Sequence, residues 1–174
     1  MEKKKNVKEV TSVNLGTTGR VDQLNAIAQG DTDESRDGNS ILCKSLIMRY
    51  DLRRGTGVNS TCRFIIFRDN QQVGDTAPAV TDVLDNDFGD IELAPLNSET
   101  VGRFTILKDW TISVTDQKPL INGKVYLPLN FHSRYNGTAS TDIQKNGLYI
   151  LACSNETTTF PTWSFAARVS FIDN

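Results

Sequence analysis

Short β-strand patterns separated by turns dominate this sequence, and the 3.6-residue periodicity of long helices is scarce. Apolar and β-branched residues gather in runs of strand length that end in glycine, proline or polar clusters. On this basis we predict the following strands: Lys8–Leu15, Ser40–Leu52, Thr61–Asp69, Gly102–Leu107, Thr111–Thr115, Lys124–Phe131, Leu148–Cys153 and Ser164–Ile172. Short strands with no helix alternating among them favour a sandwich or barrel over a parallel α/β sheet. The prediction is therefore a single all-β domain without an internal repeat.

Turn sequences lie between these runs. The glycine-containing clusters are residues 15–19, 53–57, 121–123 and 135–137. Asn122-Gly123, between two strand-like runs, is typical of a two-residue hairpin turn. Two segments indicate short helices instead, Val21–Ala28 and Ala79–Leu84, and the second is entered through Pro78. The expected helical content is therefore small.

Two of the predicted strands differ in how their apolar residues are placed. In Lys124–Phe131, Val125 and Leu127 face one way and Tyr126 faces the other, which is the alternation of a half-buried strand. In Ser40–Leu52, apolar residues fall on both faces. Such a strand either lies beneath a second layer or enters a contact between subunits.

The bulk properties are those of an ordinary globular protein. The 174 residues are 38% hydrophobic and 23% charged, which is average for such proteins. No apolar run approaches the ~20 residues that cross a bilayer, and the cations near the N-terminus are not followed by the apolar core of a signal peptide. We therefore expect an intracellular protein that is neither secreted nor bound to a membrane. Three Asn-X-Ser/Thr sequences are then interpreted as chance matches in turns: those at Asn59, Asn136 and Asn155.

Cysteine, histidine and tryptophan offer few catalytic arrangements. Cys43, Cys62 and Cys153 lie in apolar runs at a spacing that matches no zinc site, so buried reduced thiols are favoured. His132 is the single histidine, and no serine-hydrolase or phosphate-loop motif occurs. A Cys/His or Ser/His pair formed in space is the enzymatic alternative. The two tryptophans are interpreted as core or contact residues, and an enzyme is not expected.

Charge is unevenly distributed although the net charge is only −2. Four lysines lie within the first eight residues: Lys3, Lys4, Lys5 and Lys8. This basic terminus is either a small arm that contacts phosphates or a solvated, frayed end. Acidic residues gather between Gly30 and Asn39, where clustered oxygen ligands would suit calcium. The alternative for that segment is a solvated acidic loop, because its glycine spacing is not that of an EF-hand.

Five segments of the chain carry a resemblance to a known family. The strand-like runs Arg63–Asn70 and Arg103–Asp109 flank the segment Thr76–Leu84, and Leu24–Asp31 and Ser35–Gly38 precede them. In this order and spacing they resemble coat proteins of the satellite tobacco necrosis virus family, and the remainder of the chain is similar mainly in its strand pattern. Coat proteins of some small circular single-stranded DNA viruses look similar too, so the motifs do not choose between RNA and DNA.

The resemblance implies a fold and a function. The fold is a single jelly-roll β-sandwich of two four-stranded antiparallel sheets with one or two short helices, formed by residues 9–174 behind a basic arm of residues 1–8. The function is that of a viral capsid protein, whose copies assemble into a T=1 icosahedral shell of sixty subunits around a single-stranded RNA or DNA genome. The location is then the virion, assembled inside the host cell.

The resemblance also implies calcium ions between subunits. Asp31 matches the family's carboxylate at a threefold axis. Asp37 and Ser40 match positions that supply main-chain oxygens to a second calcium, and Asp173 matches its carboxylate. Copies of one carboxylate that meet on a symmetry axis repel one another, so they favour a bound cation.

Nucleic acid is the second implied partner. Relatives carry a longer and strongly basic arm that contacts the genome, whereas barely eight residues precede the first predicted strand here. The four lysines of this short arm are expected to bind phosphates weakly and in a salt-sensitive way. Arg68 and Lys108, at strand ends, are either inner-surface contacts with the genome or edge charges that discourage aberrant pairing.

Two other classes of function are weighed against the capsid. A calcium-assisted carbohydrate-binding jelly roll would hold sugar hydroxyls with the acidic loop and a tryptophan, and it would form no particles. An enzyme on a jelly-roll scaffold is disfavoured by the single histidine. The linear motifs, rather than the fold, favour the capsid, because sandwiches host many functions.

Overall fold

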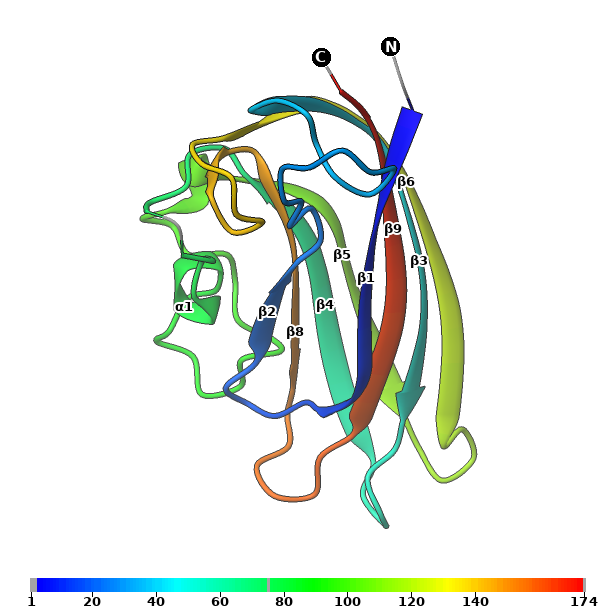
Figure 1. Cartoon of the computed structure of the whole chain (residues 1–174). Helices are drawn as coiled ribbons and strands as arrows, with labels where there is room; N and C mark the ends of the chain where they lie inside the picture. Colours follow the sequence, from blue (N-terminus) through cyan, green and yellow to red (C-terminus); the bar gives the residue numbers. More distant parts are fainter. Residues whose placement is uncertain (1–2, 75, 174) are drawn as a thin grey trace.

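Two antiparallel sheets packed face to face make up the protein (Figure 1). The computed structural model describes residues 3–74 and 76–173. The five-stranded sheet has the order β1 (Lys3–Asn14), β9 (Thr162–Asp173), β3 (Ser40–Arg53), β6 (Leu120–Tyr135) and β7 (Ile143–Lys145). The four-stranded sheet has the order β2 (Arg20–Gln23), β8 (Gly147–Ser154), β4 (Ser60–Asp69) and β5 (Phe104–Val114). Without the short β7, each sheet has four strands.

The order of the strands is that of a jelly roll. The chain passes back and forth between the sheets, so that β1 lies beside β9 and β2 beside β8, while β3 pairs with β6 and β4 with β5. Most neighbours within a sheet therefore come from distant parts of the sequence, as Greek-key connections produce. The predicted jelly-roll sandwich is confirmed, with β7 as an addition to one sheet.

Apolar side chains from both sheets fill the space between them. Trp163 packs against Phe64 and Phe165, with ring centroids 5.0 and 4.6 Å apart, and all three rings are buried. Burying such a side chain stabilises the fold by about 1.5–3 kcal/mol. Cys43 and Cys62 lie in the same cluster. Both are free and buried, as is the third cysteine, which confirms the predicted buried thiols.

A second apolar cluster lies on the outer side of the four-stranded sheet. Ile65 and Phe67 of β4 belong to it, together with residues of α1 (Val80–Val83) and of the loop that follows. Figure 1 shows α1 and its flanking loops as a layer outside β8 and β4. We call residues 76–103, which end in the 3-10 helix η1 (Val101–Arg103), the cover. Because the cover packs on this side, the central part of β4 is buried on both faces.

The first of the two predicted helices is wrong. Residues Arg20–Gln23 form β2, an edge strand that pairs with Tyr149–Ala152 of β8, and the described residues 24–39 contain no helix. Leu24 and Ile27 are buried in the core between the sheets. Pairing with β8 and burial in the core therefore override a weak helical pattern. The second predicted helix is confirmed as the short α1.

The predicted hairpin at Asn122-Gly123 is also wrong. Both residues lie inside β6, where Asn122 pairs with Asp51 and Gly123 with Tyr50 of β3. A Cβ atom at Gly123 would come within 2.2 Å of the Tyr50 ring. The glycine therefore permits close cross-strand packing and does not form a turn.

β-Bulges account for two further differences from the predicted strands. The runs Gly102–Leu107 and Thr111–Thr115 belong largely to one strand, β5, in which the register shifts opposite Ile66 and Phe67. A second bulge shifts the register of β3 beyond Cys43. It moves the inward face from odd to even positions, which is why the sequence of β3 looks apolar on both faces.

The described part of the predicted arm is a strand. Residues 3–8 belong to β1, which pairs with β9 so that Lys3 lies opposite Ile172. The predicted boundary at residue 8 therefore falls inside β1, and Met1 and Glu2 lie outside the described residues. No helix in the described ranges has the length and apolar character needed to cross a membrane.

Candidate functional site

The outer face of the five-stranded sheet is exposed and rich in cations. Its four long strands carry these exposed basic side chains, which we call the basic face: Lys3, Lys5, Lys44, Arg49, Arg53, Lys124, Arg134 and Arg168. Among the described residues of these strands, Glu9 is the one exposed acid, and Asp51 is half-buried. A chain of net charge −2 therefore concentrates positive charge on one face.

The strand register brings two of these cations directly opposite each other and places apolar residues beside others. Arg168 of β9 stands between Val7 of β1 and Ile47 of β3, and Arg49 stands directly opposite Lys124 of β6. An open groove of ≈ 930 Å³ crosses β1, β9, β3 and β6, and its lining includes the cations Arg49 and Arg53 beside the acids Glu9 and Asp51. A broad, open and cationic surface suits an extended polyanion better than a small ligand, which needs a concave apolar pocket.

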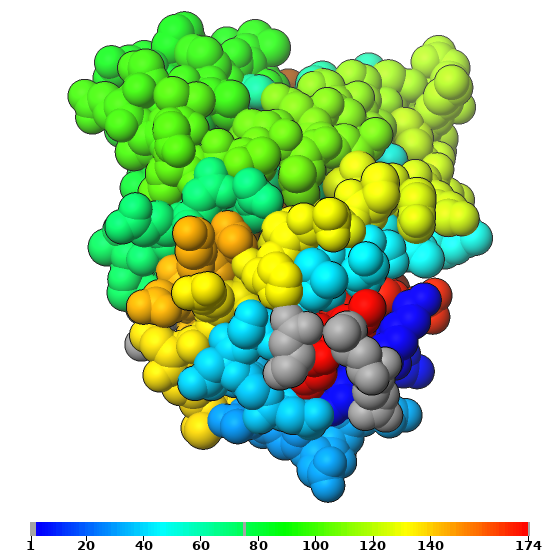
Figure 2. Space-filling model, turned by 90° about the horizontal axis from the view of Figure 1, so that it is seen from above, coloured from blue at the N-terminus to red at the C-terminus, as the bar shows by residue number. Residues whose placement is uncertain are grey.

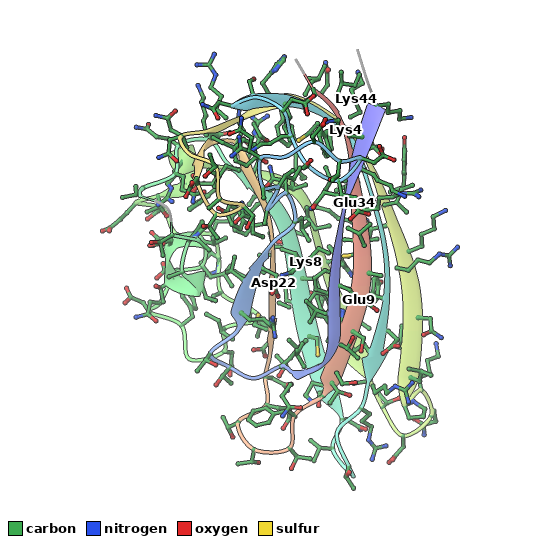
Figure 3. All side chains as sticks on the ribbon, viewed as in Figure 1. Lys4, Lys8, Glu9, Asp22, Glu34 and Lys44 are labelled. Carbon is green, nitrogen blue, oxygen red and sulfur yellow. The ribbon has the colours of Figure 1, made fainter. Side chains whose placement is uncertain are left out.

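Two of the four predicted arm lysines lie on the basic face. Lys3 and Lys5 are exposed and line a shallow depression together with Arg168. Lys8 is half-buried and Lys4 is buried; Figure 3 labels both on β1. The alternation of a strand turns every second side chain away from the outer face, which separates these two pairs of lysines.

Arg68 and Lys108 lie away from the basic face. Arg68 of β4 donates from Nε to Asn70 Oδ1 at 2.8 Å, and its guanidinium lies 5.0 Å from the Phe131 ring. Lys108 of the edge strand β5 places Nζ 5.6 Å from the Trp110 ring. The structure does not bring these two residues together with Lys3 and Lys5, and their contact with nucleic acid stays a prediction.

The cations of β3, β6 and β9 are the part of the face that sequence reasoning missed. Arg49, Lys124 and Arg168 each stand next to a buried apolar residue in their strand. Alternation within these three strands was therefore the signal that could have identified them.

One buried arginine organises the acidic loop between β2 and β3. Arg36 donates from Nε to the main-chain oxygen of Ile27 at 2.9 Å and from Nη1 to that of Gly38 at 2.8 Å. Its guanidinium lies 4.1 Å from the Tyr135 ring, and burial lowers the pKa of Arg36. These contacts fix the loop backbone and leave Asp31 exposed.

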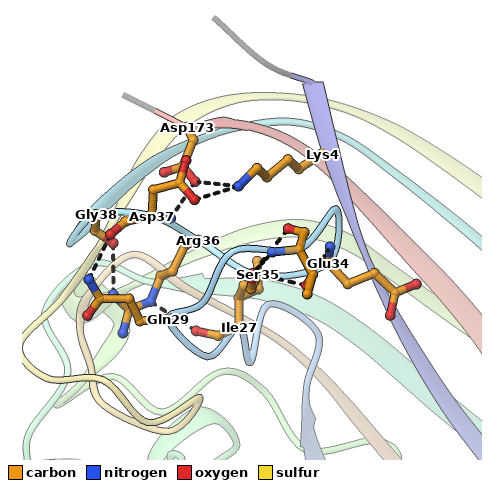
Figure 4. A network of polar contacts seen from close by, with 10 residues as sticks. Lys4, Ile27, Gln29, Glu34, Ser35, Arg36, Asp37, Gly38 and Asp173 are labelled. Atoms are coloured by element: carbon orange, nitrogen blue, oxygen red, sulfur yellow. Dashed lines mark hydrogen bonds and ion pairs between the residues drawn. The ribbon is translucent and has the colours of Figure 1, made fainter.

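Lys4, Asp37 and Asp173 form an ion-pair cluster at one end of the sandwich (Figure 4). Lys4 Nζ lies 2.7 Å from Asp37 Oδ1 and 3.5 Å from Asp173 Oδ2. The main-chain N–H of Asp37 donates to Asp173 Oδ2 at 2.6 Å. Figure 2 looks onto this end, where β1 (blue), the end of β9 (red) and the loop before β3 (light blue) meet. The hydrogen bond to Asp37 raises the pKa of Lys4, so this lysine is a cation at neutral pH.

The second predicted calcium site coincides with this cluster. The main-chain oxygen of Asp37, one of the predicted ligands, accepts a hydrogen bond from Gln29 Nε2 at 2.7 Å. Ser40, whose main-chain oxygen is another, is the first residue of β3. Because Lys4 places its charge between the carboxylates of Asp37 and Asp173, the residues do not fit the predicted ligand set while Lys4 is in place.

No metal cluster forms within one chain among the residues that the structure describes: no three histidine, cysteine, aspartate or glutamate side chains come close enough to hold an ion. Asp31 would need symmetry-related copies to complete a site. Calcium at Asp31 therefore stays a prediction.

Exposed apolar side chains mark the cover as a candidate contact surface between subunits. Phe88, Leu93 and Val101 are 50%, 71% and 48% exposed. Large apolar side chains left exposed on one segment are typical of surfaces that bind other proteins.

The cysteines and tryptophans that an enzyme or a carbohydrate-binding module would use are mostly buried. Burial raises the pKa of Cys43 to about 11 and that of Cys153 to about 12, so neither thiol is ionised at neutral pH as a nucleophile must be. Trp163 is fully buried, and Trp110 packs against the core. Neither tryptophan therefore offers the open ring on which a sugar would stack.

The comparisons with known proteins agree with the coat-protein resemblance. The family model for the satellite tobacco necrosis virus coat protein matches residues 1–174. The capsid protein of Satellite tobacco necrosis virus 1 is 39% identical over 100 residues, which are 56% of this chain and 48% of that protein. The chain thus matches about half the length of that relative.

Solved virus structures also align with the chain. Desmodium yellow mottle tymovirus aligns with a TM-score of 0.43 and 11% identity, over 98% of this chain and 85% of that chain. Broad bean stain virus aligns with a TM-score of 0.44 and 8% identity, over 94% of this chain and 85% of that chain. From the family match over its whole length, the chain belongs to the satellite tobacco necrosis virus coat protein family and is a viral capsid protein.

Proposed function

We propose that sixty copies of this chain assemble into a T=1 icosahedral shell that encloses a single-stranded nucleic-acid genome, with the basic face toward the genome. The observation that carries the proposal is the separation of charge on the subunit. Exposed cations gather on the outer face of the five-stranded sheet, whereas exposed acids gather in the loop before β3 and on the cover. The protein would then be found in the virion, after assembly inside the host cell.

Phosphate contacts give the basic face its role in this proposal. Each phosphate that a lysine or arginine neutralises releases counterions, so binding gains free energy without any base-specific contact. Arg168 lies two residue pairs further along the sheet than Lys5, because Lys5 pairs with Ser170 and Val7 pairs with Arg168. Side chains on such diagonal positions lie roughly 7–8 Å apart. Two cations at this spacing can contact the phosphates of one extended backbone that runs along a positively charged groove.

Contacts between subunits are assigned to surfaces away from the basic face. Stable interfaces bury about 1,200–2,000 Å² and centre on apolar anchors. Phe88 and Leu93 of the cover supply exposed apolar side chains of this kind. Contacts of this kind around more than one kind of symmetry axis would close a shell.

Assembly is tested first by size and shape. The full chain should form uniform spheres in negative-stain micrographs and a single large species in sedimentation, with ultraviolet absorbance at 260 nm that reports bound nucleic acid. A monomer or small oligomer across protein concentrations and salt conditions would contradict the shell.

The orientation of the subunit is tested by a matched pair of double variants. Lys5→Gln/Arg168→Gln removes two charges from the basic face, and Lys118→Gln/Lys145→Gln removes two exposed charges from elsewhere. With single-stranded nucleic acid, the first pair should lower the slope of log affinity against log salt by about 1.4, or 0.7 per lost phosphate contact. Because Lys108 is itself a predicted contact, the control leaves it in place, and Lys118→Gln/Lys145→Gln should leave the slope unchanged. Equal slopes for the two variants would refute a genome-facing basic face and leave the capsid assignment intact.

Calcium enters the proposal at Asp31 alone. This carboxylate is exposed on a loop that Arg36 holds in place, and three copies on a threefold axis would require a cation to offset their repulsion. Particles of the parent chain should then loosen in a chelator, while Asp31→Asn particles should have the same stability with and without calcium. If the variant keeps the chelator sensitivity of the parent, Asp31 is not the ligand.

A further inference from the structure

Lys4 differs from the lysines on either side of it. Its side chain is 3% exposed, whereas Lys3 and Lys5 are exposed. Lysine is almost never buried unless an acidic partner compensates its charge. The alternation of β1 turns Lys4 inward at the end of the sandwich, where Asp37 and Asp173 supply such partners.

The two aspartates present oxygens that call for a cation. Asp37 Oδ1 and Asp173 Oδ2 are the two oxygens nearest to Lys4 Nζ. Asp173 Oδ1 is buried and has no hydrogen-bond partner among the described residues. The Asp173 side chain is 6% exposed, so water does little to offset its charge, and a carboxylate buried in this way needs a positive partner.

We propose that the Lys4 ammonium is the resident cation of the Asp37–Asp173 pair and takes the place that a calcium ion would otherwise fill there. The proposal concerns one chain and does not depend on the shell or on the genome. It also accounts for the state of Asp37 in the predicted second calcium site, where the main-chain oxygen accepts a hydrogen bond from Gln29 and the carboxylate pairs with Lys4.

A tethered ammonium and a calcium ion exclude one another at this position. Both need the same carboxylate oxygens, and two cations within a few ångströms repel each other even though the Asp37 side chain is 58% exposed. The tethered charge is present at a fixed ratio of one per chain, whatever the metal concentration. Lys4 thereby joins β1 to the loop before β3 and to the end of β9 without a metal (Figure 4).

Calcium titration of matched variants tests the proposal. All variants carry Asp31→Asn, which removes the carboxylate of the other candidate calcium site. Lys4→Met then removes the ammonium but keeps a long apolar side chain, and adding Asp173→Asn removes the buried carboxylate. Calcium binding is measured by calorimetry, and the thermal midpoint is measured in calcium and in chelator.

The expected result is a gain of one calcium ion per chain on removal of the ammonium. The Asp31→Asn chain should bind no calcium that depends on Asp173. The Lys4→Met form should bind one ion and unfold at a higher temperature in calcium than in chelator, and Asp173→Asn should abolish both effects. A matched Lys5→Met form, altered on the exposed neighbour, should gain no ion.

Two outcomes overturn the proposal. In the first, the chain with Lys4 intact binds calcium that is lost with Asp173→Asn, so a metal and not the ammonium is the resident cation. In the second, neither form binds calcium, so Lys4 does not stand in a metal's place. If the Lys4→Met form folds in neither calcium nor chelator, the proposal is tested by comparing Asp31→Asn with Asp31→Asn/Asp173→Asn. Equal calcium uptake by these two chains supports the proposal, and a difference in uptake overturns it.

Discussion

The outer faces of the two sheets differ in what lies on them. On the four-stranded sheet, Ile65 and Phe67 are fully buried beneath the cover. On the five-stranded sheet, Arg168 and Lys124 are exposed, and Tyr126 is 59% exposed. Both sheets present apolar side chains to the core between them, and the difference lies outside, where the connection between β4 and β5 folds back over its own sheet.

This difference separates stability from recognition. A strand that is buried on both faces can hold few charges, whereas a strand that is buried on one face can carry any polar residue outside. Substitutions on the covered face should therefore lower the free energy of unfolding. Substitutions on the basic face should change nucleic-acid binding and leave the fold almost untouched.

The largest effect on stability is expected at Phe67, in the middle of the covered face. Its ring lies 5.4 Å from that of Phe104 and 5.6 Å from that of Tyr149. Phe67→Ala should lower the free energy of unfolding by about 3–5 kcal/mol, because it removes a buried ring and leaves a cavity. Urea unfolding of dissociated subunits measures the change.

Tyr126→Ala on the basic face is the matched control. It removes an aromatic ring that is mostly exposed, so it should change the free energy of unfolding by no more than about 0.5 kcal/mol. Similar losses for both variants would show that the two faces do not differ in the way described.

A somewhat smaller loss is expected where the cover joins β4. Arg103 donates from Nε and Nη2 to the two carboxylate oxygens of Asp69 at 2.9 and 2.5 Å, and the Asp69 side chain is 0% exposed. Arg103→Met leaves the buried Asp69 carboxylate without its positive partner, which should lower the free energy of unfolding by about 3 kcal/mol. The control is Asp116→Asn, which breaks the ion pair with Arg54 at a side chain that is 74% exposed. This variant should lower the free energy of unfolding by less than about 1 kcal/mol. If the two variants lose equal amounts, burial of the carboxylate is not the cause of the loss.

The strands could largely be predicted from sequence, but the features that join them could not. Runs of apolar and β-branched residues report strands because they fit a pleated, half-buried surface. β2 escapes this pattern because it has only four residues and owes its conformation to pairing with β8. Gly123 carries a turn signal but serves close packing against Tyr50, which lies far away in the sequence.

The candidate site shows the same division. Arg49, Lys124 and Arg168 could have been found by counting alternate positions in their strands. The burial of Lys4 could not, since its partners Asp37 and Asp173 come from the loop before β3 and from the other end of the chain. An ion pair of this kind depends on tertiary structure, and the charged and polar residues around Lys4 in the sequence indicate only a basic terminus, which is either a phosphate-contacting arm or a solvated end.

The pH dependence of stability gives an effect of intermediate size. Burial raises the pKa of Cys62 and of Cys153 to about 12 and that of Cys43 to about 11. In the unfolded chain these thiols ionise near pH 9, whereas in the folded protein they stay neutral to higher pH. The folded state is therefore at its most stable below pH 9, and this stability is lost as the pH rises toward the pKa values of the folded protein. Between pH 9 and 11, each thiol should lower the free energy of unfolding by about 1.4 kcal/mol per pH unit.

One cysteine variant connects this slope to the comparison of the two faces. Cys153 belongs to the cluster under the cover, whereas Cys43 and Cys62 lie between the sheets. Cys153→Ala should reduce the alkaline slope by about one third near pH 9, where three similar thiols dominate it, and by less toward pH 11, where burial of Tyr135 and Tyr149 raises their pKa and adds to the slope. Phe67→Ala should also speed the reaction of Cys153 with a thiol reagent more than that of Cys43. Equal acceleration at both would mean that the variant loosens the whole sandwich and not the covered face.

The smallest effect is expected on the basic face, and its sign is reversed. Arg49 and Lys124 are paired directly across β3 and β6, and like charges in that arrangement destabilise a sheet. Lys124→Glu should therefore raise the free energy of unfolding by about 0.5 kcal/mol in low salt, and 1 M sodium chloride should screen most of the gain. Binding to single-stranded nucleic acid should weaken at the same time.

The double variant Arg49→Glu/Lys124→Glu is the control. It restores a pair of like charges, so it should lose the gain in stability while weakening nucleic-acid binding further. If Lys124→Glu instead lowers the stability of the subunit, a nearby acid such as Asp51, which is diagonal to Lys124 in the sheet, already relieves the repulsion between Arg49 and Lys124.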